Sequence, residues 1–180
     1  MFFVSECYTS APKNFETPLQ EEVYKTLGKL NIPFQRVQTD EAITMDDCVS
    51  IDEKLDMKMV KTLFLCNRQQ TCFYLFVTTG HKTFSSKNFS TALNISRVSF
   101  APAELMMKKL GTKIGAATVF SALQDKQNEV QIVIDKDVAG EKWYGCSDGT
   151  TTGYMKIETS RILNDFLTET KHQPKIISID

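Results

Sequence analysis

The chain has 180 residues, 42% hydrophobic and 24% charged, so it is long enough to bury a core and has an ordinary globular composition. Its 21 basic and 22 acidic residues give a net charge of −1, which excludes a globally basic surface that recruits nucleic acid. No segment approaches the run of about 20 apolar residues that a membrane span needs, and residues 1–6 lack the positive region of a secretory signal, so we expect a cytoplasmic protein without a membrane partner.

The order of the periodic segments predicts an α+β fold. Residues 1–17 read as an irregular lead-in and residues 18–180 as one domain. The expected helices cover residues 18–31, 44–48, 85–93, 102–110 and 159–168. The expected strands cover residues 34–38, 59–66, 71–78, 98–100, 129–134, 143–146 and 153–157, and the tail 174–180 is either an edge strand or loose. Because helices alternate with short strands joined by tight turns, we expect a mixed, mainly antiparallel sheet packed by helices.

One lysine, Lys61, lies inside the apolar, strand-like run from Met59 to Leu65. Such a strand is normally buried on at least one face, where an ammonium group needs a partner or a ligand. The alternative is a packed lysine stem with its charged end in water. The segments that follow Lys61 in the chain favour a role for this lysine in a ligand-binding or catalytic site.

The cysteines and histidines do not indicate a metal site. Five cysteines at irregular spacing without a signal sequence indicate reduced thiols. Cys66 and Cys72 flank a polar turn, so a redox pair across a hairpin is an alternative. The sequence has two histidines, His81 and His172, which gives too few convergent ligands for the common metal centres, so we expect none.

The remaining motifs occur in a characteristic order. They are Ile32-Pro33-Phe34, the Lys61 strand, Phe100-Ala101 before a helix, Gly115 to Phe120, Gln124-Asp125 and Asp135-Lys136-Asp137 at a strand end. In order and spacing, residues 18–168 resemble the YbaK/ProX family, the free-standing relatives of the editing domain inserted in bacterial prolyl-tRNA synthetase.

The resemblance implies a compact α+β domain that hydrolyses the ester of a mischarged tRNA carrying a small amino acid such as alanine or cysteine. The implied partner is the tRNA acceptor end, with an aminoacyl-tRNA synthetase as a second candidate. An aminoacyl ester is already activated, so the reaction needs no cofactor and no protein nucleophile. The site has to hold the substrate, admit one water and stabilise the developing oxyanion.

Carried over residue by residue, the resemblance gives Lys61 the catalytic role, because its ammonium can bind a phosphate or the ester carbonyl. Gly115 allows the backbone to approach the substrate closely. The residues expected to bind substrate are Thr62, Gly115, Ala116, Ala117, Thr118, Ser147 and Thr151.

Three positions depart from the family pattern. Val119 stands where the family loop G-x-x-x-P has proline, and Thr62 stands where the prolyl-editing branch has asparagine. Ser147, Asp148 and Thr151 align with the His, Pro and Asn of an H-P-x-x-N segment, and serine offers no imidazole chemistry. The alternative function is therefore a catalytically eroded relative that binds aminoacyl-tRNA, an amino acid or a protein partner.

Overall fold

A computed structural model describes residues 1–42 and 44–180, and its helices and strands form an α+β fold. The α-helices are α1 (Pro18–Lys29), α2 (Val49–Leu55), α3 (Ser86–Leu93), α4 (Ala103–Leu110), α5 (Lys136–Ala139) and α6 (Leu167–Glu169). The strands are β1 (Gln35–Gln38), β2 (Val60–Asn67), β3 (Phe73–Thr79), β4 (Val98–Phe100), β5 (Val130–Asp135), β6 (Trp143–Ser147), β7 (Gly153–Glu158) and β8 (Lys175–Ile177). Short 3₁₀ turns, η1 (Asp46–Cys48) and η2 (Val119–Leu123), and a π-helical segment, η3 (Arg161–Phe166), complete the fold.

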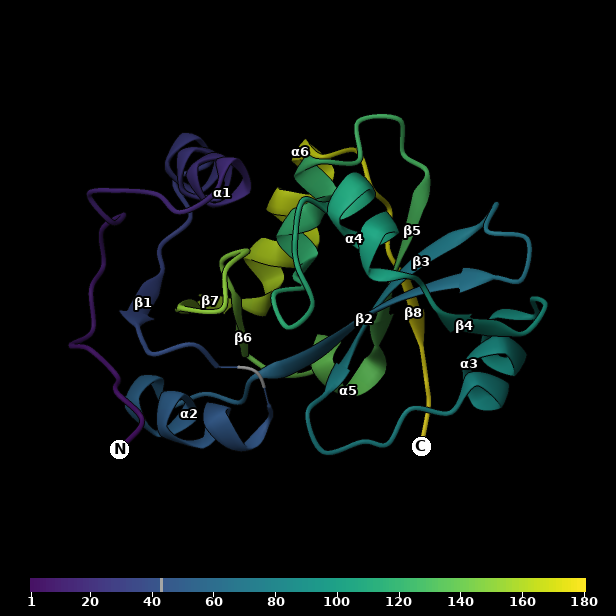
Figure 1. The fold of residues 1–180 in the computed structure, drawn as a ribbon, viewed down its shortest axis with the longest axis horizontal. Coiled ribbons are helices and arrows are strands. Elements are labelled where there is room, and N and C mark those ends of the chain that lie inside the picture. Colours follow the sequence, from purple (N-terminus) through teal and green to yellow (C-terminus); the bar gives the residue numbers. More distant parts are fainter. Residues whose placement is uncertain (43) are drawn as a thin grey trace.

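The strands form two sheets (Figure 1). The larger has the order β4-β2-β3-β5-β8, with β4, β2 and β3 antiparallel and with β3, β5 and β8 parallel. The smaller has the order β1-β7-β6 and is antiparallel throughout. The predicted mixed, mainly antiparallel arrangement is confirmed, although it is divided between two sheets.

Alternating side chains place the core on both faces of the larger sheet. Phe64 of β2 belongs to the main cluster, which also contains Leu27 of α1 and Tyr144 of β6. Leu65 points to the opposite face and packs with Phe89 of α3. The main core therefore lies between the two sheets, and α3 covers the outer face.

The two sheets meet where β2 begins. Met59 forms a parallel bridge with Gly145 of β6. A Cβ atom on Gly145 would lie 2.5 Å from the Met57 sulfur and 2.9 Å from the Lys58 carbonyl oxygen. Glycine at position 145 is thus what allows the chain leading into β2 to lie directly against β6.

Three elements differ from the sequence-based expectation. The short helix expected over residues 44–48 is a 3₁₀ turn followed by α2, which runs on to Leu55 because Ile51 and Leu55 are buried one turn apart. The expected last helix contains the π-helical segment η3. The tail contributes the edge strand β8, which pairs in parallel with β5.

The lead-in, residues 1–17, runs alongside β1 (Figure 1). Val4 and Tyr8 form isolated bridges with Thr39 and Arg36, and the Arg36 guanidinium lies 4.8 Å from the centre of the Tyr8 ring. The lead-in therefore covers the edge strand of the smaller sheet, which would otherwise expose unpaired backbone groups.

All five cysteines are free thiols. Cys66 is buried on β2, whereas Cys72 is exposed just before β3. Cys66 lies opposite Phe73, the neighbour of Cys72, so the two thiols point to different faces of the hairpin. This placement does not favour the redox pair.

Candidate active site

A cavity of about 450 Å³ lies where the two sheets meet. β4 pairs with β2 from Leu65 onward, so the first residues of β2 have open space on that side and form one wall. The loop at Gly115 and the end of β6 supply the other walls. The volume suits a small ligand group rather than a folded partner.

The lining divides into a buried floor and an exposed rim. The floor is formed by Ala42, Cys48, Met59, Phe64, Cys146 and Tyr154, and the rim by Thr44, Met45, Phe100, Ile114 and Gly115. The floor is therefore mostly apolar. A ligand that enters from the rim places its innermost atoms against carbon and sulfur, which favours a small uncharged group.

Lys61 lies on the β2 wall of this cavity. Its side chain is half-buried, and its ammonium donates a hydrogen bond to the main-chain carbonyl of Lys82. An ammonium has three N–H donors, and this is the one hydrogen bond that it gives within residues 1–42 and 44–180. Thr62 lines the same wall, beside Lys61. Lys61 therefore lies in the cavity wall, and its role in a site stays a prediction.

The loop after α4 supplies the facing wall. Gly115 has φ +89°, a backbone conformation that favours glycine, and a Cβ added there would meet Thr151 at 3.5 Å. Gly115 and Ala117 line the cavity, whereas Ala116 and Thr118 are fully buried behind it. The Thr118 hydroxyl donates to the Ser147 carbonyl at 2.9 Å, so Thr118 ties this loop to β6.

Ser147 lines the cavity, but its hydroxyl is used within its own turn. Ser147 Oγ donates to the Thr150 carbonyl at 2.6 Å and accepts from the Gly149 N–H at 3.0 Å. Thr151 is buried outside the lining, and its hydroxyl donates to Glu41 at 3.0 Å. A hydrogen bond from Lys113 to the same carboxylate lowers the pKa of Glu41.

Asp148 is the buried centre of this turn. Its carboxylate accepts hydrogen bonds from Tyr24 (2.8 Å) and Gln20 (2.9 Å) of α1 and from the Thr150 hydroxyl (2.7 Å). Burial, reinforced by the charge of Asp148, raises the pKa of Tyr24, so the phenol remains a donor. The segment that aligns with H-P-x-x-N is therefore a structural anchor between α1 and β6.

Sequence reasoning did not include two thiols of the floor, Cys48 and Cys146, among the site residues. Burial raises the pKa of Cys48 to about 11 and raises the pKa of Cys146 as well. Both are protonated at neutral pH and are poor nucleophiles. Cys146 could have been found from its place next to Ser147, but Cys48 reaches the floor only through the packing of η1.

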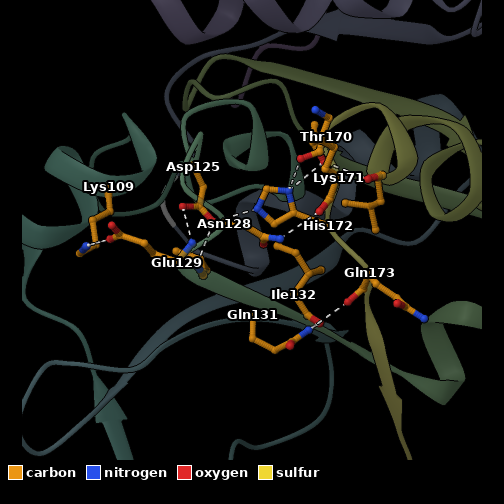
Figure 2. A network of polar contacts seen from close by, with 12 residues as sticks. Lys109, Asp125, Asn128, Glu129, Gln131, Ile132, Thr170, Lys171, His172 and Gln173 are labelled. Carbon is orange, nitrogen blue, oxygen red and sulfur yellow. Dashed lines mark hydrogen bonds and ion pairs between the residues drawn. The ribbon is translucent and has the colours of Figure 1, made fainter.

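Gln124-Asp125, one of the motifs that suggested the family, lies outside the cavity lining. Asp125 accepts from the N–H groups of Glu129 (2.9 Å) and Val130 (2.8 Å) and contacts His172 Nε2 at 2.8 Å. Figure 2 shows Asp125 between Glu129 and His172. His172 Nδ1 faces the Thr170 carbonyl at 2.9 Å. This buried network fixes the start of β5 to the segment before β8, which is a structural role.

Two further features bear on the chemistry. Within residues 1–42 and 44–180, no group of three or more His, Cys, Asp or Glu side chains could hold a metal ion. None of the helices described for this chain is long and apolar enough to cross a membrane.

Comparison with known proteins identifies the family of this chain. The family described as "Aminoacyl-tRNA editing domain" matches residues 39–164. Because the match covers more than half of the sequence, the chain belongs to the aminoacyl-tRNA editing domain family, which confirms the resemblance to YbaK/ProX proteins.

Two relatives and one solved structure are similar to this chain over most of its length. The chain is 26% identical over 164 residues to "Prolyl-tRNA synthetase associated domain-containing protein 1" of Danio rerio, covering 90% of this chain and 88% of the relative. It is 29% identical over 122 residues to "Prolyl-tRNA editing protein ProX" of Acetoanaerobium sticklandii, covering 67% and 74%. A solved structure of a candidate trans-editing enzyme for prolyl-tRNA synthetase superimposes with a TM-score of 0.68 at 14% identity, covering 92% of this chain and 100% of that one, and shows the shared fold.

Proposed function

We propose that this protein is a trans-acting aminoacyl-tRNA deacylase that removes a wrong small amino acid, such as alanine or cysteine, from tRNA. The observation that carries the proposal is the place of Lys61, a half-buried lysine in the same cavity lining as Gly115, whose ammonium has the Lys82 carbonyl as its one hydrogen-bond partner among the described residues. Membership in the editing family supports the reaction class.

The cavity offers binding and electrostatic stabilisation rather than a nucleophile. Lys61 donates to the ester carbonyl and stabilises the oxyanion as water attacks, and the exposed backbone at Gly115 contacts the terminal ribose or the aminoacyl group. The apolar floor accepts the amino-acid side chain, and its size limits the substrate, although one methylene is worth only about 1–3 kcal/mol. The partner is a tRNA acceptor end in the cytoplasm, and the names of the relatives favour prolyl-tRNA synthetase as the enzyme whose errors are removed.

The test is a deacylation assay on tRNAs charged with alanine, cysteine or serine, comparing wild type with Lys61→Ala. Loss of one oxyanion donor lowers the rate about 100-fold or more. Lys109→Ala is the control, because Lys109 pairs with Glu129 at 2.8 Å and does not line the cavity. No hydrolysis of any charged tRNA by wild type, or an unimpaired Lys61→Ala, would contradict the proposal.

A second candidate is a non-catalytic binder of aminoacyl-tRNA, an amino acid or a protein partner. It is favoured by the engaged hydroxyl of Ser147 and by a cavity lining, among the described residues, that contains no imidazole and no carboxylate. A non-hydrolysable aminoacyl-adenosine analogue separates the two candidates. Binding of the analogue without turnover of any charged tRNA identifies a binder, whereas binding with turnover identifies a deacylase.

A further inference from the structure

Lys82, in the loop between β3 and α3, is the most heavily hydrogen-bonded lysine of the part of the chain described here. Its ammonium donates to Asp135 at 2.8 Å, to Asp137 at 2.7 Å and to the main-chain carbonyl of Ile179 at 2.7 Å. Its side chain is 13% exposed, and the three acceptors come from the end of β5, from α5 and from the tail after β8. All three donors of this ammonium are therefore engaged within the protein.

The acceptor Asp135 is itself fixed. It is fully buried, accepts from the Thr78 hydroxyl at 2.6 Å and accepts from the Asp137 N–H at 2.9 Å. Burial opposes the charge of Lys82, but hydrogen bonds to Asp135 and Asp137 outweigh it and raise the pKa of Lys82. A charged pair held in this way defines one side-chain position, because breaking it would leave a buried carboxylate unpaired.

The same residue reaches Lys61 through its backbone. The Lys82 carbonyl accepts from the Lys61 ammonium, and Thr78, which binds Asp135, lies directly opposite Lys61 in the β2–β3 ladder. A free lysine side chain samples many rotamers, and a fixed acceptor removes that freedom before substrate arrives. The carbonyl that positions Lys61 is fixed in turn by the anchored side chain of Lys82.

We infer that Lys82 is a positioning residue, which holds its own carbonyl in place so that this carbonyl fixes the position of the Lys61 ammonium at the cavity wall. This inference rests on the proposed function for its catalytic meaning. The contact of Asp137 and of the tail carbonyl with Lys82 makes the C-terminal segment part of the support for Lys61.

The test compares Lys82→Met and Lys82→Arg with wild type. Lys109→Met is the matched control. The Lys109 side chain is also mostly buried (20% exposed), but its contacts, with Glu129 and with the Phe73 ring, do not involve Lys61. The first readout is the rate at which formaldehyde and a borane reductant methylate Lys61, followed by peptide mass spectrometry. An amine held in a hydrogen bond to a fixed carbonyl is less accessible to the reagent, so we expect methylation of Lys61 to be several-fold faster in Lys82→Met and unchanged in Lys109→Met.

The second readout is deacylation. Misplacing the ammonium lowers kcat about tenfold in Lys82→Met with KM within about twofold, because the oxyanion contact is made in the transition state. Lys82→Arg restores most of the loss, since a guanidinium can reach the same oxygen acceptors. A Lys82→Met protein that is folded and methylates Lys61 at the wild-type rate overturns the inference.

The two readouts keep this inference separate from the proposed function. If wild type hydrolyses no charged tRNA, the proposed function fails, and the methylation rate still decides whether Lys82 positions Lys61. If Lys82→Met does not fold, Lys82→Gln decides, because its shorter neutral amide can still donate a hydrogen bond but cannot engage Asp135, Asp137 and the Ile179 carbonyl together. Faster methylation of Lys61 in that variant supports the inference, and an unchanged rate overturns it.

Discussion

Two walls of the same cavity differ in how their polar groups are used. On the β2 wall, the three-donor ammonium of Lys61 gives one hydrogen bond, to a carbonyl, among the residues that the structure describes. On the opposite wall, Ser147 donates and accepts within its own turn, and Asp148 below it is occupied by α1. The comparison teaches that lining a cavity is not enough for a chemical role. A side chain also needs hydrogen-bonding capacity that the fold has left unused.

The sharpest way to break this comparison is to remove one polar group from each wall. Lys61→Ala should lower deacylation about 100-fold or more, whereas Ser147→Ala should change it less than about threefold. Thermal unfolding should show the reverse order, because Ser147→Ala loses two buried hydrogen bonds and Lys61→Ala loses one that is half-exposed. Equal losses of activity would mean that both walls are catalytic.

Removing the support of the Ser147 wall should mainly cost stability. Asp148→Ala leaves the Tyr24 hydroxyl and the Gln20 amide without their buried acceptor, which should lower the free energy of unfolding by about 3 kcal/mol. Urea unfolding measures this loss. Tyr24→Phe is the matched variant, which should cost less because it removes the donor together with its need for a partner.

The Gly115 loop can be tested against a glycine of similar conformation elsewhere. Gly115 (φ +89°) and Gly111 (φ +69°) both have positive φ, so alanine at either position should cost about 1 kcal/mol of stability. Gly115 lines the cavity and Gly111 does not. Gly115→Ala alone should therefore slow deacylation, and an equal effect of Gly111→Ala would show that both changes act through general destabilisation.

The smallest expected effect is a pH dependence of fold stability that arises from Asp52 of α2. Asp52 accepts from the Met59 N–H at 3.0 Å, and burial raises its pKa to about 6. A raised carboxyl pKa stabilises the fold below the unfolded value of about 4, and this contribution is lost as the pH rises through 6. Asp52→Asn should thus match wild type in melting temperature near pH 4 and exceed it at pH 7.5. A constant difference at both pH values would contradict this assignment.

Much of the fold could be predicted from the sequence. Periodicity and turn residues placed α1, the β2–β3 hairpin, β5 and the β6–β7 pair near their observed bounds. It did not indicate that the strands separate into two sheets, because that depends on the long-range approach at Gly145. Nor did it indicate α2, whose stripe of two buried residues is too short for a clear periodic signal.

Only part of the candidate site could be predicted, because sequence patterns indicate local structure and not contacts between distant segments. A lysine in an apolar strand is a local signal, and a glycine-led loop is another, so Lys61 and Gly115 could be singled out before the fold was known. The hydrogen-bonding state of Ser147 and the place of Cys48 in the floor depend on contacts between distant segments. The local sequence does not show which hydroxyl will be hydrogen-bonded within the folded protein.

The bridge between Met59 and Gly145 has a consequence for how the protein would fail under stress. The residues that line the cavity come from three stretches of chain that only the docking of the two sheets brings together, namely 42 with 44–64, 100–117 and 146–154. A slight parting of the sheets would open the cavity while each sheet keeps its own ladder of hydrogen bonds. At low denaturant concentrations, ligand binding should then be lost before the circular dichroism signal changes. The reason is that the two sheets separate while the hydrogen bonds within each sheet remain.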